Sequence, residues 1–277
     1  MSTCWPSHRA SPTGVSVDTI DVSARVWAAL LALRNGESVT TPADWSADEH
    51  RAFDLYSPLA TRQSRPVTVG QIGQSLDGRI AVVNDDDREV SGPDGLIHLH
   101  RMRALVDGVV IGVGTALHDS PRLTVRLCEG PQPARIVIDP RGRLPHDAPM
   151  LADDGARRIV IQASAIERPA GVEVIELPSD DGRLDPTVML ARLHDLGLRN
   201  LLIEGGGFTL SRFIEAELLE RLHIAIAPVI IGAGPQGLTL QKPPEELSEA
   251  MRPATTAYSL GTDVVFDCAL DSELAAG

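Results

Sequence analysis

The sequence predicts an α/β fold in which helices cover a largely parallel sheet. From residue 66 onward, short runs rich in Val and Ile recur between charged residues, Gly and Pro, which is typical of buried strands. Between these runs, apolar residues recur every three to four positions, which is typical of amphipathic helices. Strands that alternate with helices in this way indicate a layered domain.

The individual elements follow from the same patterns. The expected strands centre on residues 67–69, 109–111, 136–138, 159–161, 201–203, 222–226, 229–231 and 264–266. The last third is rich in strands, so we expect a mixed sheet at that end. One helix is expected to begin at a Ser91 cap, a second at Asp185-Pro186 with its end at Gly197, and a third at Gly207.

Residues 1–65 are expected to form an N-terminal extension, and residues 66–277 the main domain. Five of the nine aromatic residues fall within the first 56 residues, and this change in composition places a boundary near Arg65-Pro66. Within the extension we expect a helix over Val26 to Leu33, ended near Asn35-Gly36, and a second over Asp44 to Tyr56.

Charge and composition exclude several classes of protein. The net charge of −13 argues against a nucleic-acid partner, and a single lysine, Lys242, argues against Schiff-base chemistry and a Walker-type phosphate loop. No run approaches the ~20 apolar residues of a membrane span, and no signal peptide is recognisable, so we expect a cytoplasmic protein. Residues 65–145 carry 10 basic and 10 acidic residues, whereas residues 146–277 carry 10 and 21, so an anion site is expected in the middle segment.

Two candidate binding motifs, one for a dinucleotide and one for a metal, are not supported by the residues around them. Gly232 to Gly237 matches G-x-G-x-x-G after an expected strand, but no helical pattern follows it, as a dinucleotide fold requires. His98 and His100 lie two residues apart on an expected helix, so their side chains diverge and a shared metal is not expected. We expect no metal site.

A better candidate is the segment Leu201-Leu202-Ile203-Glu204-Gly205-Gly206-Gly207-Phe208. Here a buried strand ends in a carboxylate and three glycines, and a helix follows. The glycines allow close approach of a ligand to the backbone, and the helix N-terminus offers N–H groups to a phosphate. A tight turn with a capping carboxylate is the alternative interpretation, but three glycines exceed what a turn needs.

Two further segments carry weaker signals. In one, the strand at 109–111 runs into Gly112-Val113-Gly114-Thr115, and Asp119-Ser120-Pro121-Arg122-Leu123-Thr124-Val125-Arg126 follows. Its arginine guanidinium groups suit phosphate. In the other, residues 67–74 lead into Ser75-Leu76-Asp77-Gly78-Arg79.

Taken in order, these segments and the later Ile226 to Gly234 resemble the pyrimidine reductases of riboflavin biosynthesis, which include the reductase half of the bacterial deaminase–reductase. The resemblance spans about residues 66–267 and implies a three-layer αβα, dihydrofolate-reductase-like fold with a mixed, mostly parallel sheet. It also implies a homodimer and the cofactor NADPH. The activity implied is reduction of a ribosylamino-pyrimidine 5′-phosphate to its ribitylamino form, by hydride transfer to C1′ of the ribose.

The resemblance also implies site residues. Those that would contact the cofactor are Gly73, Thr115, Asp119, Gly206, Gly207, Phe208, Thr209, Leu210, Ser211 and Arg212. Those that would hold the phosphorylated substrate are Arg103, Leu123, Arg126 and Glu204. Glu204 and Asp77 are the candidate catalytic residues, and replacing Glu204 by Gln is expected to reduce turnover and leave folding intact.

Departures from the family leave the substrate open. The zinc deaminase signature is absent, so no deamination is expected. Gln71 stands where the bacterial form has lysine, Glu89 where it has tryptophan, and Ser120 where the family usually has aspartate. Reduction of another ring, such as a pterin, and a nucleotide-binding protein without catalysis therefore remain as alternatives.

Overall fold

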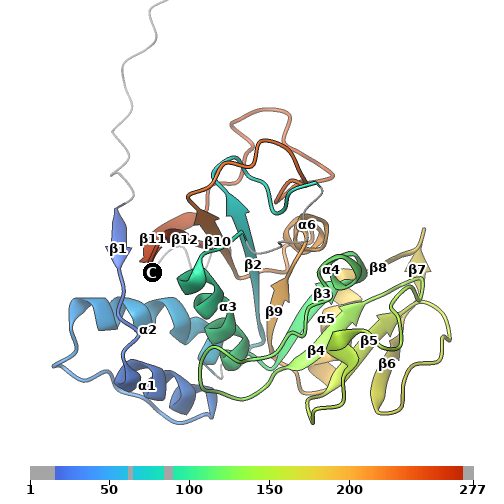
Figure 1. Ribbon diagram of the computed structural model, residues 1–277, viewed down its shortest axis with the longest axis horizontal. Coiled ribbons are helices and arrows are strands. Elements are labelled where there is room, and N and C mark those ends of the chain that lie inside the picture. Colours follow the sequence, from blue (N-terminus) through green and yellow to red (C-terminus); the bar gives the residue numbers. More distant parts are fainter. Residues whose placement is uncertain (1–15, 62–64, 84–89, 271–277) are drawn as a thin grey trace, which may run out of the picture.

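The computed structural model describes residues 16–61, 65–83 and 90–270 and confirms the α/β class (Figure 1). One ten-stranded sheet has the order β1-β11-β12-β10-β2-β9-β3-β4-β5-β6. The strands from β10 to β6 in this order run parallel, whereas β12 is antiparallel to both β10 and β11. The sheet is therefore mixed at the end built by the last third of the chain, as the sequence predicts.

The strands of this sheet are short. They are β1 (Val17–Thr19), β2 (Val67–Ser75), β3 (Gly108–Gly112), β4 (Ala134–Ile138), β5 (Arg158–Gln162), β6 (Val172–Glu176), β9 (Asn200–Glu204), β10 (Arg221–Ala227), β11 (Ala254–Leu260) and β12 (Asp263–Ala269). A separate hairpin pairs β7 (Ser179–Asp180) with β8 (Arg183–Leu184).

The helices are α1 (Ala24–Arg34), α2 (Ala47–Ala60), α3 (Pro93–Leu105), α4 (Val113–Asp119), α5 (Pro186–Asp195) and α6 (Gly207–Glu215), with a 3-10 turn at Pro149–Leu151. The expected helices that begin at Asp185-Pro186 and at Gly207 are both present. None of the helices in the described ranges is long and apolar enough to cross a membrane.

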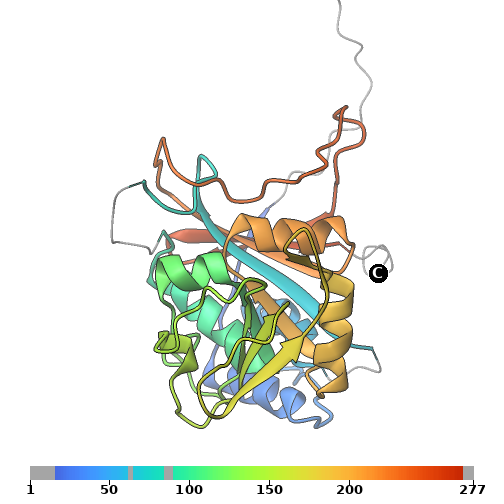
Figure 2. The same ribbon diagram turned by 90° about the vertical axis from the view of Figure 1, so that its right-hand side faces the viewer.

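Alternate residues of the central strands face two different cores. In β3, Val109 and Ile111 pack with α1, α2 and α3, whereas Val110 packs on the opposite face with α5 and α6. The same alternation separates Leu202 from Leu201 in β9. In Figure 2 the green helices and the gold helices lie on opposite sides of the cyan strand β2. The fold is thus the predicted three-layer αβα arrangement.

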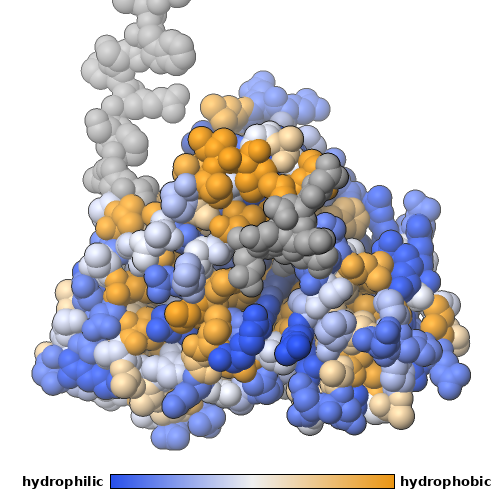
Figure 3. All heavy atoms as spheres, in the orientation of Figure 1, coloured by the Kyte–Doolittle hydropathy of each residue, from blue (hydrophilic) through white to orange (hydrophobic). Residues whose placement is uncertain are grey.

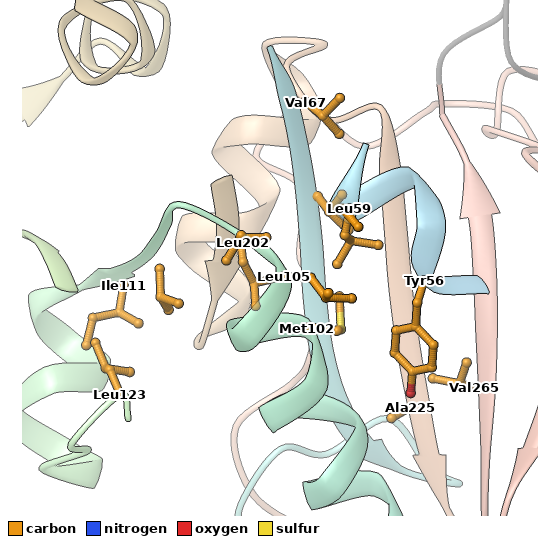
Figure 4. Packing of buried hydrophobic residues seen from close by; sticks show 14 of the residues in the cluster. Tyr56, Leu59, Val67, Met102, Leu105, Ile111, Leu123, Leu202, Ala225 and Val265 are labelled. Carbon is orange, nitrogen blue, oxygen red and sulfur yellow. The ribbon is translucent and has the colours of Figure 1, made fainter. Parts of the chain in front are cut away.

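The N-terminal extension shares its core with the rest of the molecule. Tyr56 and Leu59 of α2 are fully buried and belong to one apolar cluster with Met102 and Leu105 of α3 (Figure 4). Strand β1 also extends the sheet, because it pairs in parallel with β11. The domain boundary near residue 66 stays a prediction. Residues on both sides of it belong to one continuous apolar core.

A buried polar chain links α2 to the sheet through α3. The Tyr56 hydroxyl lies 2.7 Å from His98 Nδ1, and His98 Nε2 lies 3.3 Å from His223 Nδ1 on β10. The two imidazoles stack with ring centroids 5.3 Å apart. His223 Nε2 lies 3.4 Å from Asp267 Oδ1 on β12, and Asp267 also accepts a hydrogen bond of 2.9 Å from Arg221 Nε. These contacts give polar side chains partners where water is excluded.

Residues 229–231 do not form the expected strand. Their backbone is held as a loop, because Asp77 accepts hydrogen bonds from the N–H groups of Ile231 (3.0 Å) and Gly232 (2.7 Å). The N–H group of Leu76 donates to the carbonyl of Val229 (2.9 Å). The side chain of Ile230 is 74% exposed, so this apolar run is not buried as its composition suggested. An apolar run alone does not distinguish a strand from a loop held by side chains.

Two helix starts also differ from the prediction. Helix α3 begins at Pro93 after Gly92, which makes no side-chain cap, so Ser91 is not the capping residue. The segment after Gly112 forms helix α4, which was not among the predicted helices. Strands β1, β6 and β11 were not predicted: β1 and β6 lie at the two edges of the sheet, where the apolar pattern is weak, and β11 is built mostly from small and polar residues.

Candidate active site

A cavity of about 1170 Å³ opens at the carboxyl ends of the parallel strands. Its wall includes Gln71 of β2, Glu204 of β9, Gly112 of β3 and Ile138 of β4, and one face of α3 closes one side. Open α/β sheets bind ligands at this edge. The cavity brings together residues from three sequence segments that were singled out separately.

Arg103 and Glu204 form a buried ion pair in the cavity wall. Arg103 Nε donates to Glu204 Oε1 at 2.8 Å, and Nη2 donates to Oε2 at 2.7 Å. Burial by itself would lower the pKa of Arg103, but Glu204 raises it above the ordinary value. This two-pronged geometry fixes both side chains. Each carboxylate oxygen keeps a further lone pair that can accept a hydrogen bond from a ligand.

Thr115 and the glycines after β9 form a second part of the wall. Thr115 Oγ1 accepts a hydrogen bond of 2.9 Å from the Gly206 N–H group. Gly205 has a φ of 99°, and a Cβ atom there would lie 2.8 Å from Thr115 Oγ1. A Cβ atom at Gly207 would lie 1.4 Å from the carbonyl oxygen of Gly237. Two of the three glycines are therefore required by close packing.

Helix α6 begins at this glycine segment. Gly206, Gly207, Phe208 and Thr209 all line the cavity, and no side chain caps the start of the helix. Uncapped N–H groups at a helix N-terminus favour an anion. Arg212, one turn further on, also lines the cavity, and burial together with Arg183 lowers its pKa.

The wall of the cavity is basic although the protein is acidic. Three carboxylates line it, those of Asp119, Asp181 and Glu204. Against them stand seven arginines, namely Arg103, Arg122, Arg126, Arg141, Arg143, Arg183 and Arg212. Within the described ranges only Arg103 among these seven forms an ion pair. Unpaired guanidinium groups in a concave wall attract anionic ligands.

Several of these wall residues were not predicted from the sequence. Arg141 and Arg143 follow β4, and Arg183 lies in the β7–β8 hairpin. The Arg141 guanidinium packs over Gly182, where a Cβ atom would lie 2.7 Å from Nε. Two arginines directly after a predicted strand were a usable signal, whereas the approach of the hairpin depends on the tertiary fold.

Other predicted residues lie where expected. Gly73, Asp119, Leu123 and Arg126 all line the cavity. Asp119 is paired with His118 at 2.6 Å. Whether these residues contact a ligand stays a prediction.

Three predicted residues lie outside the cavity wall. Leu210 is fully buried in the core beneath α6, and Ser211 Oγ accepts a hydrogen bond of 3.2 Å from the Thr239 N–H group. Asp77 accepts a hydrogen bond of 2.6 Å from the Ser75 hydroxyl in addition to its two bonds to the 231–232 backbone.

These bonds to Asp77 have a chemical consequence. The Ser75 hydroxyl and the backbone N–H groups of Ile231 and Gly232 lower the pKa of Asp77 to about 2. A carboxylate held in this way supports a loop and has no proton to donate near neutral pH. The structure therefore favours a structural role for Asp77 over a catalytic one.

His98 and His100 point to different surroundings, as their spacing predicts. His98 belongs to the buried polar chain, whereas His100 lines the cavity. In the described part of the chain, no group of three or more His, Cys, Asp or Glu side chains could hold a metal ion.

Comparison with known proteins now defines the family. The model of the RibD C-terminal domain matches residues 66–266. The chain belongs to the RibD C-terminal domain family. All the described residues that line the cavity lie within the matched range of this chain, residues 66–266.

Relatives and solved structures agree with this assignment. The chain is 31% identical over 214 residues to the 2,5-diamino-6-ribosylamino-4(3H)-pyrimidinone 5′-phosphate reductase of Methanothermobacter thermautotrophicus, covering 73% of this chain and 97% of that protein. The fold is similar to Acinetobacter baumannii RibD (TM-score 0.65, 21% identity), covering 80% of this chain but only 62% of that longer one. It is also similar to the riboflavin biosynthesis reductase Rib7 of Saccharomyces cerevisiae, with a TM-score of 0.62, 19% identity and coverage of 88% and 97%.

Proposed function

We propose that the protein is an NADPH-dependent reductase that converts a ribosylamino-pyrimidine 5′-phosphate to its ribitylamino form. The observation that carries this proposal is one cavity that unites the Arg103–Glu204 pair, the uncapped start of α6 and a set of unpaired arginines. Membership of the RibD C-terminal domain family, with a reductase of that substrate as a relative, supports the same activity.

The residues present fit a nicotinamide dinucleotide. A Cβ atom at Gly114 would meet nothing within 4 Å, so the backbone there borders open space, and the start of α6 at Gly207 and Phe208, which no side chain caps, borders the same cavity. The backbone of 206–209, together with Thr115 and Arg212, would hold the phosphates of the cofactor. When bound, the reduced nicotinamide supplies a hydride.

The substrate would lie at the other part of the wall, near Glu204. The carboxylate of Glu204 would accept hydrogen bonds from N–H groups of an aminopyrimidine, while Arg103 holds it in place. Arg126, which lines the cavity without a carboxylate partner among the described residues, would bind the 5′-phosphate. These residues bind and orient the ribose rather than react with it.

The unpaired arginines after β4 support NADPH over NADH. In dinucleotide folds the adenosine ribose lies near the end of a strand next to the phosphate-binding turn, and an arginine there accommodates the 2′-phosphate. Here Arg141 and Arg143 follow β4, and they line the same cavity as the start of α6, where the cofactor phosphates would lie. Arg183 of the hairpin lines the same region of the wall beside Gly182.

The test is oxidation of NADPH by the purified protein with the ribosylamino-pyrimidine 5′-phosphate. We expect turnover with this substrate and none with a pterin, and saturable binding when NADPH is titrated. Binding without turnover on either substrate would favour a nucleotide-binding protein, and absence of NADPH binding would exclude the reductase.

We also propose that the protein forms a homodimer. Leu76, Val229, Ile230 and Met251 are exposed apolar residues on loops after β2 and β10. Figure 3 shows apolar surface gathered at the top of the molecule over this region. Light scattering should give twice the 29.6 kDa of one chain, and a monomer at micromolar concentration would contradict the proposal.

A further inference from the structure

The loop that carries Arg126 has an unfavourable backbone. It connects α4 to β4 without regular secondary structure, and two of its non-glycine residues are left-handed, with φ of 43° at Ser120 and 55° at Leu123. Such conformations cost energy and persist only where the surroundings impose them. The buried side chain of Leu123 lies beside Ile111 of β3 and anchors the middle of the loop (Figure 4).

Three side chains from outside this segment hold the backbone of residues 124–126. Arg103 Nη1 donates to the Thr124 carbonyl at 3.3 Å. Gln132 forms two bonds to Val125, donating to its carbonyl and accepting from its N–H group, each at 2.8 Å. The third is His100, whose Nδ1 atom lies 3.0 Å from the Arg126 N–H group. Each of the three residues in this segment is therefore fixed by a different side chain.

His100 can act only in its neutral form. Its Nδ1 atom accepts the proton of a backbone N–H group, so the ring carries its own proton on Nε2. Burial, together with the charges of Arg103 and Arg126, lowers the pKa of His100 to about 4. The ring is therefore an acceptor at neutral pH. It also borders the cavity, where it could touch a ligand directly.

Replacement of Gln132 distinguishes positioning of the loop from direct contact with a ligand. Gln132 also holds residues 124–126, through its two bonds to Val125, but it does not line the cavity. A loss of binding on replacement of Gln132 must therefore act through the loop. Arg126 is the one residue of the held segment 124–126 whose side chain lines the cavity.

We propose that His100 and Gln132 are positioning residues that hold residues 124–126 so that Arg126 presents its guanidinium to the substrate phosphate. This inference rests on the proposed function, in which Arg126 binds that phosphate. It adds that recognition of the phosphate depends on two side chains that make no charged contact with it.

The experiment compares the substrate with its dephosphorylated form in five single variants and one double variant. His100→Leu and Gln132→Leu remove the bonds to the loop, whereas His100→Asn keeps an acceptor near the position of Nδ1. Arg126→Gln measures how much binding is lost when the guanidinium itself is removed. His146→Leu is the matched control, because His146 is exposed and lies outside the cavity wall.

The expected result is specific to the phosphate. His100→Leu and Gln132→Leu should raise KM for the phosphorylated substrate about tenfold, equivalent to 1.4 kcal/mol, and leave KM for the dephosphorylated form unchanged. The dissociation constant of NADPH and the kcat should stay within about twofold in both, and His100→Asn should restore most of the loss. In the Arg126→Gln background, His100→Leu should add nothing, because both act on one contact.

Other results overturn the inference in distinguishable ways. An equal rise in KM for both forms of the substrate, or weaker NADPH binding in Gln132→Leu, would show a general loss of structure. Wild-type values in His100→Leu and Gln132→Leu would reject positioning while leaving the proposed function intact. A wild-type protein that binds NADPH but turns over neither form of the substrate would reject both.

Discussion

At the residue scale, the buried pair of Arg103 and Glu204 changes what a substitution should do. The sequence suggested that Glu204→Gln would leave folding intact, but the substitution would leave Arg103 buried without its counter-charge. We expect kcat/KM to fall at least about tenfold and the free energy of unfolding to fall by roughly 3–5 kcal/mol. Denaturant titration and steady-state kinetics measure the two effects. Unchanged stability would show that the pair is not buried in solution, and unchanged kcat/KM would remove Glu204 from the substrate site.

The arginines after β4 make a second prediction at this scale. Replacing both Arg141 and Arg143 by Gln should weaken NADPH binding by about tenfold to a hundredfold and leave NADH binding unchanged, because only NADPH carries the 2′-phosphate. Fluorescence titration with the two cofactors measures this ratio. Arg157→Gln is a suitable control, since Arg157 is half-exposed, pairs with Glu173 and lies outside the cavity. Equal losses for both cofactors would place the 2′-phosphate elsewhere.

At the scale of elements, the starts of α4 and α6 respond differently to the same change. A Cβ atom at Gly207 would collide with the Gly237 carbonyl, whereas one at Gly114 would enter open space. Gly207→Ala should therefore lower the free energy of unfolding by roughly 1–3 kcal/mol. Gly114→Ala should not lower it, because alanine favours the helix, but it should weaken NADPH binding. Thermal unfolding and cofactor titration separate the two. The reverse order of stability would contradict the close packing of α6.

The loop after β10 shows why an element can be missed. The run at 229–231 has the composition of a strand, yet Asp77, far away in the sequence, binds its backbone and holds it exposed. Asp77 had been predicted as a catalytic candidate from the resemblance to the pyrimidine reductases. The sequence singled out Asp77, but only the fold shows that its partner is the backbone of residues 231–232.

At the scale of the whole molecule, the polar chain through Tyr56 joins the extension to the sheet. Tyr56→Phe would leave His98 Nδ1 without its hydrogen-bond partner in a water-excluded site. We expect the free energy of unfolding to fall by about 1–3 kcal/mol, with kcat unchanged because the chain lies outside the cavity wall. Denaturant titration checks this value. A variant as stable as the wild type would mean that the extension contributes only apolar contacts.

Two buried histidines, His98 and His100, make stability depend on pH. Burial, His223 and Arg101 lower the pKa of His98 well below its ordinary value of 6.5, and the pKa of His100 falls to about 4. In the unfolded chain both histidines bind protons below about pH 6.5, while the folded chain leaves them neutral. The free energy of unfolding should therefore decrease as pH falls from about 6.5 toward 4. Denaturant titrations across this range measure the slope, and a rise in stability toward acid would contradict buried neutral histidines.

The sequence by itself determined the layered fold and singled out several residues that line the cavity. Local patterns sufficed for the central strands, for α5 and α6, and for Glu204, Thr115 and Arg126, because short-range spacing fixes which residues are buried and which end a strand. The tertiary structure decided which of these residues share one cavity. It also showed that Arg141 and Arg183 join them and that His100 and Gln132 hold the loop of Arg126. These facts depend on contacts between segments distant in the chain, and no local pattern encodes such contacts.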